Sequence, residues 1–292
     1  MMKGFFTCLR MKKMIAAAVA LMPVLCLGQA QIDTKKMKIS DFTEKITKVV
    51  LTGNQFYDAF LKSEVAAKWR VSPFEFCTME EFESLKADDS YYFLLTTKGQ
   101  FRKEAEPGLM FLTLAKGGIQ ADKGIDEMLE IVAFPYASAE DPSGREVVFF
   151  PAFLDIIQNY ALDSMDKDIN AYTGLSNYTI NISKSGGMTL VFSESDLSDE
   201  ITPQIKNQCF DKDVLVLEEE KADEYLSPEN ADVLVSYVAV PSSPKPGSYC
   251  YKMLIAPQTN TLYYFRKHRI SKKAGAGFLA EDIRRITSPR QK

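Results

Sequence analysis

The sequence predicts an α/β protein of the α+β type, built from two similar modules that each hold a mixed sheet with packed helices. The first observation is an internal repeat, because a shift of 140 positions aligns two apolar stripes of equal spacing. The stripes are Tyr57, Leu61, Val65 and Trp69 in the first half, and Leu197, Ile201, Ile205 and Cys209 in the second. A spacing of four residues places side chains on one face of a helix. The same shift aligns Phe74 and Phe76 with Val214 and Val216, which extends the repeat into a strand.

The second observation is the order of elements in the first module, residues 48–166, which reads β-α-β-α-β-β-β-α. The expected strands lie at 48–51, 74–77, 91–97, 109–114 and 128–134, and the expected helices at 54–68, after Thr78, and at 149–165 with a start at Pro151 as the alternative. Thr78 and Glu81 form a capping-box pattern, which satisfies free amides at a helix start. A strand–helix–strand step predicts a parallel pair, and the later hairpins predict antiparallel pairs.

The same order returns in the second module, residues 189–287. Its strands are expected at 189–192, 214–217, 233–240, 249–255 and 262–266, and its helices at 197–209, 219–226 and 276–286. Pro203 interrupts the first of these helices, so Thr202 and Pro203 are alternatively the cap and first position of a shorter helix. The polar segment 167–188 is interpreted as a linker and 288–292 as a tail.

The N-terminus has the pattern of a secretory signal peptide over residues 1–28. Lys12 and Lys13 precede an apolar run at 14–27, and small residues follow. The run is shorter than the roughly 20 residues of a membrane-spanning helix. Cleavage near Gly28 or Ala30 would give a periplasmic or secreted protein, and we do not expect an integral membrane protein.

Two alternatives remain open at this end of the chain. The true start is either Met1 or Met11, and residues 29–47 are expected to be a polar lead-in. Cys26 raises a lipoprotein interpretation, but Leu25 before it is larger than the residue that lipid attachment normally requires. Free secretion is therefore the preferred prediction.

The charge balance argues against nucleic acid as a partner. The whole chain has 35 basic and 39 acidic residues, a formal net charge of −4. Removing residues 1–28 takes away four basic residues and no acids, which leaves 31 basic against 39 acidic residues, a net of −8. Nucleic-acid binding normally shows a basic footprint.

One run of the first module carries a family resemblance. The residues that carry it are Lys68-Trp69-Arg70-Val71, the strand at 74–77, Glu80-Glu81-Phe82 with Leu85, and the run 90–95. This run is similar to the N-terminal domain of the Tol translocation protein TolB and to related modules of curli-secretion lipoproteins. The resemblance covers about residues 48–166 and again 189–287, without the propeller repeats of TolB. It implies a cell-envelope module that binds other proteins.

A basic segment is the main candidate for partner binding. It contains Arg266, Lys267, His268, Arg269, Lys272 and Lys273. Such a patch suits an acidic envelope protein or an anionic envelope surface, while a solvated strand end is the simpler interpretation. His268 is the only histidine, so catalysis by Ser-His or Cys-His pairs and sites with several histidines are strongly limited.

The other chemistry-bearing groups also have structural explanations. The acidic run 218–224 opens a predicted helix, where carboxylates favour the helix dipole. No glycine-rich stretch fits a phosphate loop, and we expect no cofactor and no metal. Cys209 and Cys250 could form a disulfide, although buried free thiols are the preferred interpretation. Ser164 lies in a short pattern similar to O-glycosylation acceptors of Bacteroidetes envelopes.

The sequence thus favours an exported, non-enzymatic envelope protein that binds or scaffolds a partner through its two modules. A carboxylate-dependent hydrolase acting on glycan is one alternative, which would need two carboxylates about 5–10 Å apart in a groove. A small-molecule or lipid carrier is the other, which would need a large apolar cavity.

Overall fold

The computed structural model describes residues 39–100, 107–166 and 174–288. The predicted signal peptide, both predicted starts, the cleavage positions, Cys26 and the first part of the lead-in lie outside the described residues.

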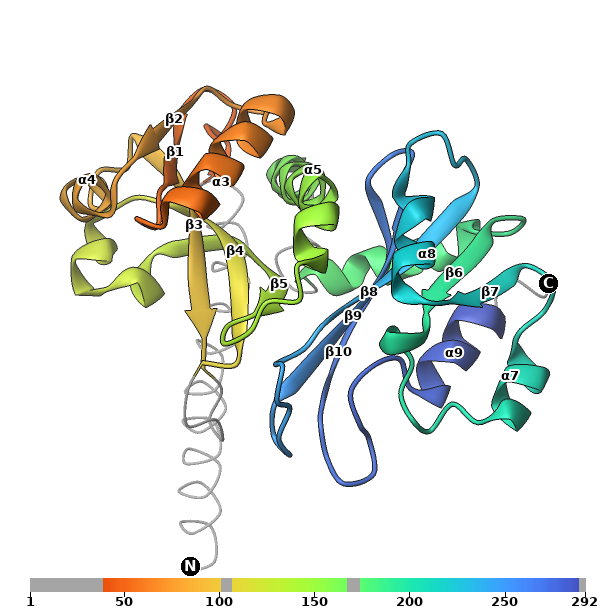
Figure 1. Ribbon diagram of the computed structural model, residues 1–292. Helices are drawn as coiled ribbons and strands as arrows, with labels where there is room; N and C mark the ends of the chain where they lie inside the picture. The colour runs from red at the N-terminus through yellow and green to blue at the C-terminus, as the bar shows by residue number, and fades with distance from the viewer. Residues whose placement is uncertain (1–38, 101–106, 167–173, 289–292) are drawn as a thin grey trace, which may run out of the picture.

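The described chain contains two five-stranded sheets, each with its own helices (Figure 1). The first module comprises β1 (Ile46–Val50), α3 (Gln55–Lys68), β2 (Phe74–Cys77), α4 (Met79–Leu85), β3 (Tyr91–Gly99), β4 (Leu109–Lys116), η1 (Ile119–Lys123), η2 (Ile125–Glu127), β5 (Leu129–Ser138) and α5 (Arg145–Asp166). After η3 (Gly174–Lys184), the second comprises β6 (Thr189–Ser193), η4 (Glu194–Asp196), α7 (Pro203–Cys209), β7 (Val214–Leu217), α8 (Glu219–Asp223), η5 (Glu224–Leu226), β8 (Val233–Ala239), β9 (Tyr249–Ala256), β10 (Thr261–Arg269) and α9 (Ala280–Thr287).

Both sheets have the same topology, which confirms the predicted fold class. The strand orders are β2-β1-β3-β4-β5 and, read in the matching direction, β7-β6-β8-β9-β10. In each sheet the first three strands pair in parallel and the last two add as antiparallel hairpins. β1 and β6 therefore occupy equivalent positions, as a duplication requires.

The strand register shows that the repeat contains a gap in the connection after its first strand. Val49 lies opposite Phe76, whereas Phe192 lies opposite Val216. The offset falls from 27 residues (76 minus 49) to 24 (216 minus 192), so the second connection is three residues shorter. The predicted helix at 197–209 is accordingly wrong over its first half, and α7 begins at Pro203 with Thr202 as its cap.

The last helix of each module also begins elsewhere than predicted. α5 begins at Arg145, four residues before the predicted 149, and Pro151 lies inside the helix. α9 begins at Ala280 rather than 276 because the chain before it makes a close crossing. Gly277 has a φ of +90°, and a Cβ there would lie 2.6 Å from the backbone oxygen of Asp196.

The described part of the predicted linker has a structure of its own. Residues 174–184 form the 3-10 helix η3, in which Leu175 and Ile182 are buried. η3 lies along the outer edge of β10, where the Thr179 hydroxyl donates to the carbonyl of Phe265 at 2.9 Å. The segment is thus part of the second module's fold.

α5 is shared by both modules (Figure 1). Phe150 packs on Phe60 of α3, with ring centroids 5.0 Å apart. Phe149 lies 4.6 Å and Phe153 lies 5.0 Å from the ring of Tyr237 on β8. A helix that is apolar on both sides is buried on both sides, so one core runs from the first sheet through α5 to the second.

Candidate functional site: the cleft between the modules

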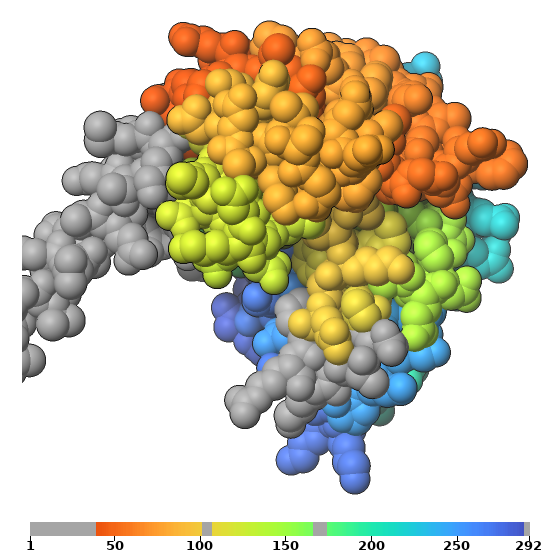
Figure 2. All heavy atoms as spheres, turned by 90° about the vertical axis from the view of Figure 1, so that its left-hand side faces the viewer, coloured from red at the N-terminus to blue at the C-terminus, as the bar shows by residue number. Residues whose placement is uncertain are grey.

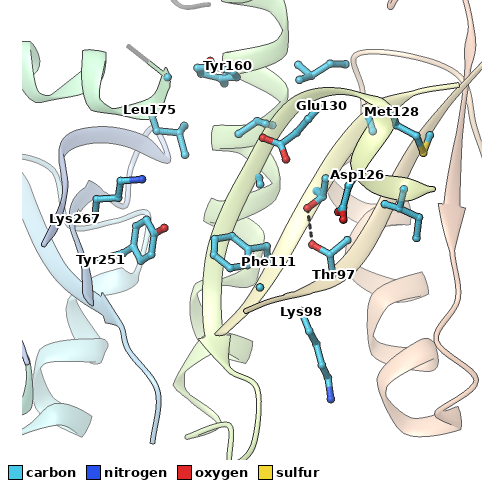
Figure 3. A pocket seen from close by; sticks show the side chains of 18 of the residues that line it. Thr97, Lys98, Phe111, Asp126, Met128, Glu130, Tyr160, Leu175, Tyr251 and Lys267 are labelled. Atoms are coloured by element: carbon cyan, nitrogen blue, oxygen red, sulfur yellow. Dashed lines mark hydrogen bonds between the residues drawn. The ribbon is translucent and has the colours of Figure 1, made fainter. Parts of the chain in front are cut away.

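A cleft of about 590 Å³ lies between the outer face of β3–β5 and the strands β9 and β10. Figure 2 shows the first module stacked above the second, with the yellow-green segment that contains η1 and η2 near their boundary. Figure 3 shows Tyr251 and Lys267 on one side of the cleft and Thr97, Asp126 and Met128 on the other. The site is therefore built by both modules and exists only when they are packed together.

The first-module wall is the sheet face opposite α3 and α5. The hydroxyl of Thr96 faces Tyr57 of α3, so its neighbour Thr97 faces the other way, into the cleft. Thr97 shares a hydrogen bond of 2.9 Å with the hydroxyl of Thr113 on β4. Asp126 and Glu130 also line this wall. Because charged side chains lie among its lining, the cleft does not match the apolar cavity that a lipid carrier needs.

The second-module wall is part of a basic–aromatic cluster, which we define as Tyr249, Tyr251, Lys267 and Arg269, and of which Tyr251 and Lys267 line the cleft. Strand pairing places Lys267 opposite Tyr251 and Arg269 opposite Tyr249. The Lys267 ammonium lies 5.4 Å from the Tyr249 ring centroid and 5.9 Å from that of Tyr251. The Arg269 guanidinium lies 5.1 Å from the Tyr249 ring and donates to its hydroxyl at 3.1 Å. These are cation–π contacts.

The positive charge of this cluster is not neutralised within the described part of the chain. Neither Lys267 nor Arg269 forms an ion pair with a described carboxylate, and both side chains are exposed. Arg266, which directly precedes Lys267 in the sequence, lies 3.5 Å from Glu281 and from Asp282. The two cations of the cluster therefore remain available to a negative partner.

The predicted basic patch is thus divided between two sheet faces and the turn beyond β10, and its role in partner binding stays a prediction. Successive strand residues point to opposite sheet faces, so Arg266 and His268 face α9 and its preceding loop. His268 Nε2 hydrogen-bonds the carbonyl of Gly275 at 2.8 Å, and burial together with nearby Lys252 lowers the pKa of this imidazole. Lys272 and Lys273 lie in the exposed turn beyond β10.

A second charged cluster locks the two modules together beside the first turn of α5. Arg145 Nη1 donates to both carboxylate oxygens of Asp196 at 2.9 Å. Its Nε and Nη2 donate to Asp223 at 2.8–3.0 Å, and Nη2 also donates to the Ser236 carbonyl at 2.9 Å. The guanidinium lies 5.5 Å from the Tyr237 ring. All these partners belong to the second module.

The electrostatics of this cluster suit a structural role. Burial disfavours the charged guanidinium, but Asp196 and Asp223 outweigh it and raise the pKa of Arg145. Burial raises the pKa of Asp223 in spite of its bonds with Arg145. Asp196 also accepts a 2.5 Å hydrogen bond from the Ser236 hydroxyl. Because both carboxylates are committed to Arg145, neither is free to act as a catalytic acid or base.

The remaining predicted site residues are separate from the cleft. Cys77, Cys209 and Cys250 are free thiols in the structure. Burial raises the pKa of Cys77 to about 11 and that of Cys250 to about 12, so both stay protonated at neutral pH. Ser164 lies in α5 and its hydroxyl oxygen is buried, while its glycosylation stays a prediction.

The described ranges contain no cluster of three or more His, Cys, Asp or Glu side chains placed to hold a metal ion. Among the helices that the structure describes, none combines the length and the apolar character needed to cross a membrane.

The fold and site define a two-module α/β protein with a basic–aromatic cleft at the module junction. No family model, curated protein or solved structure matches this chain. The similarity to the TolB N-terminal domain therefore rests on the residues that carry it.

Sequence reasoning did not single out three of the residues that build this region. Tyr249 and Tyr251 are spaced like Lys267 and Arg269, two apart on predicted neighbouring strands, and this shared spacing was the available signal. Arg145 follows a turn at a helix start, where a cation opposes the helix dipole. A cation in that position signals carboxylate partners elsewhere in the fold.

Proposed function

We propose that this chain is a non-enzymatic cell-envelope protein that binds an acidic segment of a partner protein in the cleft between its modules. The observation that carries the proposal is the exposed cation Lys267 on the cleft wall with Arg269 beside it on the same sheet face, neither of which is ion-paired with a described carboxylate. In a chain of net charge −4, such a pair marks where a negative partner can approach. Stacking on Tyr249 and Tyr251 holds the cations in place and lowers the ordering cost of binding.

Export is the second part of the proposal. It is supported by the order of charged, apolar and small residues at 1–28 and by the similarity to envelope modules. Mass spectrometry of the protein from its host should find a mature N-terminus at Gln29 or Gln31. Retention of Met1 or Met11 would contradict export, and a lipid on Cys26 would replace free secretion with membrane anchoring.

Crosslinking in intact cells tests the binding site. A photo-crosslinking residue in place of Thr97 is expected to capture one envelope protein reproducibly. The double variant Lys267→Glu/Arg269→Glu should lose most of that capture. Lys272→Glu/Lys273→Glu is the matched control, because it reverses two exposed charges a few residues away, outside the cluster, and should keep the capture. Equal capture by both double variants would overturn the proposed site.

A carboxylate-dependent glycan hydrolase is the second candidate, and one observation favours it: Asp126 and Glu130 both line the cleft (Figure 3). Glycan hydrolysis uses two carboxylates that flank the scissile bond. Purified protein should then release reducing ends from envelope glycan, and Asp126→Asn or Glu130→Gln should abolish the release. If the native chain shows no turnover, the hydrolase proposal is wrong and partner binding remains the proposed function of the cleft.

A further inference from the structure

The outer edge of β10 is only partly covered. β10 is the last strand of the second sheet and pairs with β9 on one side. On its other side, η3 satisfies the first half of the strand. The Asn181 amide donates to the Leu262 carbonyl at 3.0 Å, and the Phe265 amide donates to the Thr179 hydroxyl at 3.2 Å. The N–H and C=O of Phe265 therefore point away from β9.

The same backbone groups repeat past Phe265, toward the first residue of η3, Gly174, which lines the cleft together with Lys267. In an antiparallel pair, residues alternate between bonding the neighbouring strand and facing outward. Because Phe265 faces outward, the amides and carbonyls of Lys267 and Arg269 face outward as well. No described residue forms a hydrogen bond with these four groups. The pairing with β9 on the other side of the strand continues to Ile270, whose amide donates to the Ser248 carbonyl at 2.8 Å. Among the described residues, this leaves a short length of open sheet edge at Lys267–Arg269, beside the cleft.

We propose that this edge accepts an extended acidic segment of the partner protein as an added strand. An open edge supplies main-chain hydrogen bonds to such a segment, and alternate side chains supply the specificity. Acidic residues two positions apart on the segment would lie on one face and meet Lys267 and Arg269. The inference rests on the proposed function, and it adds the binding mode and the sequence pattern of the ligand.

The charges of Lys267 and Arg269 favour an acidic segment over a second copy of the chain at this edge. Lysine on an edge strand normally prevents pairing with other edges. Two β10 edges from two copies would bring Lys267 and Arg269 of each against like charges, which opposes dimerisation. An acidic strand reverses the sign of this interaction, so the feature that excludes self-pairing favours an acidic partner.

The test uses blocked six-residue peptides with Glu at the second and fourth positions and Thr or Val elsewhere, titrated against the full mature protein at low salt. Fluorescence anisotropy is expected to show binding that weakens at least tenfold in Lys267→Glu/Arg269→Glu and is retained in Lys272→Glu/Lys273→Glu. Hydrogen exchange should slow at the amides of Lys267 and Arg269 when the peptide binds.

Backbone N-methylation separates strand addition from simple charge attraction. Methylating either the Glu amides at positions 2 and 4 or the Val or Thr amides at positions 3 and 5 keeps the charge but removes alternate N–H groups. One of the two methylated peptides should lose binding and the other should keep it. Equal binding by both overturns strand addition but leaves charge recognition by the cluster intact. If no peptide binds while crosslinking in cells persists, strand addition is again overturned and the proposed function stands.

Discussion

Equivalent faces of the two sheets are covered by different elements in the two modules. On the first sheet, Lys48 pairs with Phe93, and Lys48 forms a 2.5 Å ion pair with Glu75 at the surface. On the second sheet, Val191 and Val235 occupy the equivalent positions, and both are fully buried. The first face is covered by α4 with η1 and η2, and it opens into the cleft. The second face shares its core with α5, a helix supplied by the first module.

The last helices of the two modules, α5 and α9, also differ in what they cover. α5 has 22 residues and is apolar toward both sheets, whereas α9 has 8 residues. α9 buries Ile283 and Ile286 against its own sheet and exposes Arg284 and Arg285. A polar outer surface is what ends a stack of repeated units. The comparison teaches that the duplicated modules share one core, in which α5 of the first module covers a face of the second.

Arg145→Ala should break this arrangement with the largest effect. It leaves Asp196 and Asp223 as buried carboxylates without their cation, which typically costs about 3–5 kcal/mol of unfolding free energy. Denaturant unfolding of the variant measures the loss. The matched control is Arg285→Ala, which removes an exposed ion pair with Glu281 and should cost less than about 1 kcal/mol. Similar losses in both variants would mean that the junction does not hold the modules together.

Asp282→Asn should destabilise only the second module, by about 3 kcal/mol at pH 7, because it removes the buried partner of Lys252. Burial raises the pKa of Asp282, but Lys252 and Tyr264 outweigh it and hold the pKa below its ordinary value of 3.8. A depressed pKa gives stability that is present above pH 3.8 and is lost as pH falls through the folded-state pKa. The stability gap between variant and native chain should therefore narrow below about pH 4. A gap that stays constant with pH would contradict the ion pair.

A pair of identical substitutions sharpens the contrast between α5 and α9. Ile157→Val in α5 and Ile283→Val in α9 each remove one methylene from a fully buried site, at a cost of about 0.5–1.5 kcal/mol. Hydrogen-exchange rates should show which sheets each substitution destabilises. Ile157→Val is expected to speed exchange in both sheets, and Ile283→Val only in the second. Exchange confined to the first sheet in Ile157→Val would show that α5 does not couple the modules.

A small effect on stability is also expected for Lys267→Glu/Arg269→Glu. Both side chains are exposed and contribute cation–π contacts of about 0.5–1 kcal/mol each, so the free energy of unfolding should fall by about 1–2 kcal/mol. Binding of the acidic partner should nevertheless fall at least tenfold. A large loss of stability would show that the cluster is a structural part of the sheet rather than a binding surface.

Local patterns predicted those elements whose signals lie within a few residues. Thr78 and Glu81 form the capping box in the structure, and Thr202 caps a helix that begins at Pro203. The order of strands and helices along the chain, with parallel pairs followed by antiparallel hairpins, was predicted from hydrophobic runs and connection lengths. The start of α5 was missed because Arg145 opposes the helix dipole locally and is stabilised by carboxylates 51 and 78 residues away.

The sequence by itself determined that the chain is an α/β protein with two similar modules of one element order, because strand and helix periodicity are local properties. Only the tertiary structure decided which faces are covered and which remain open. The division of 266–273 between two sheet faces, the cleft and the open edge at Lys267–Arg269 all depend on how α5 and η3 pack. Packing of this kind joins residues distant in sequence, so no local pattern specifies it.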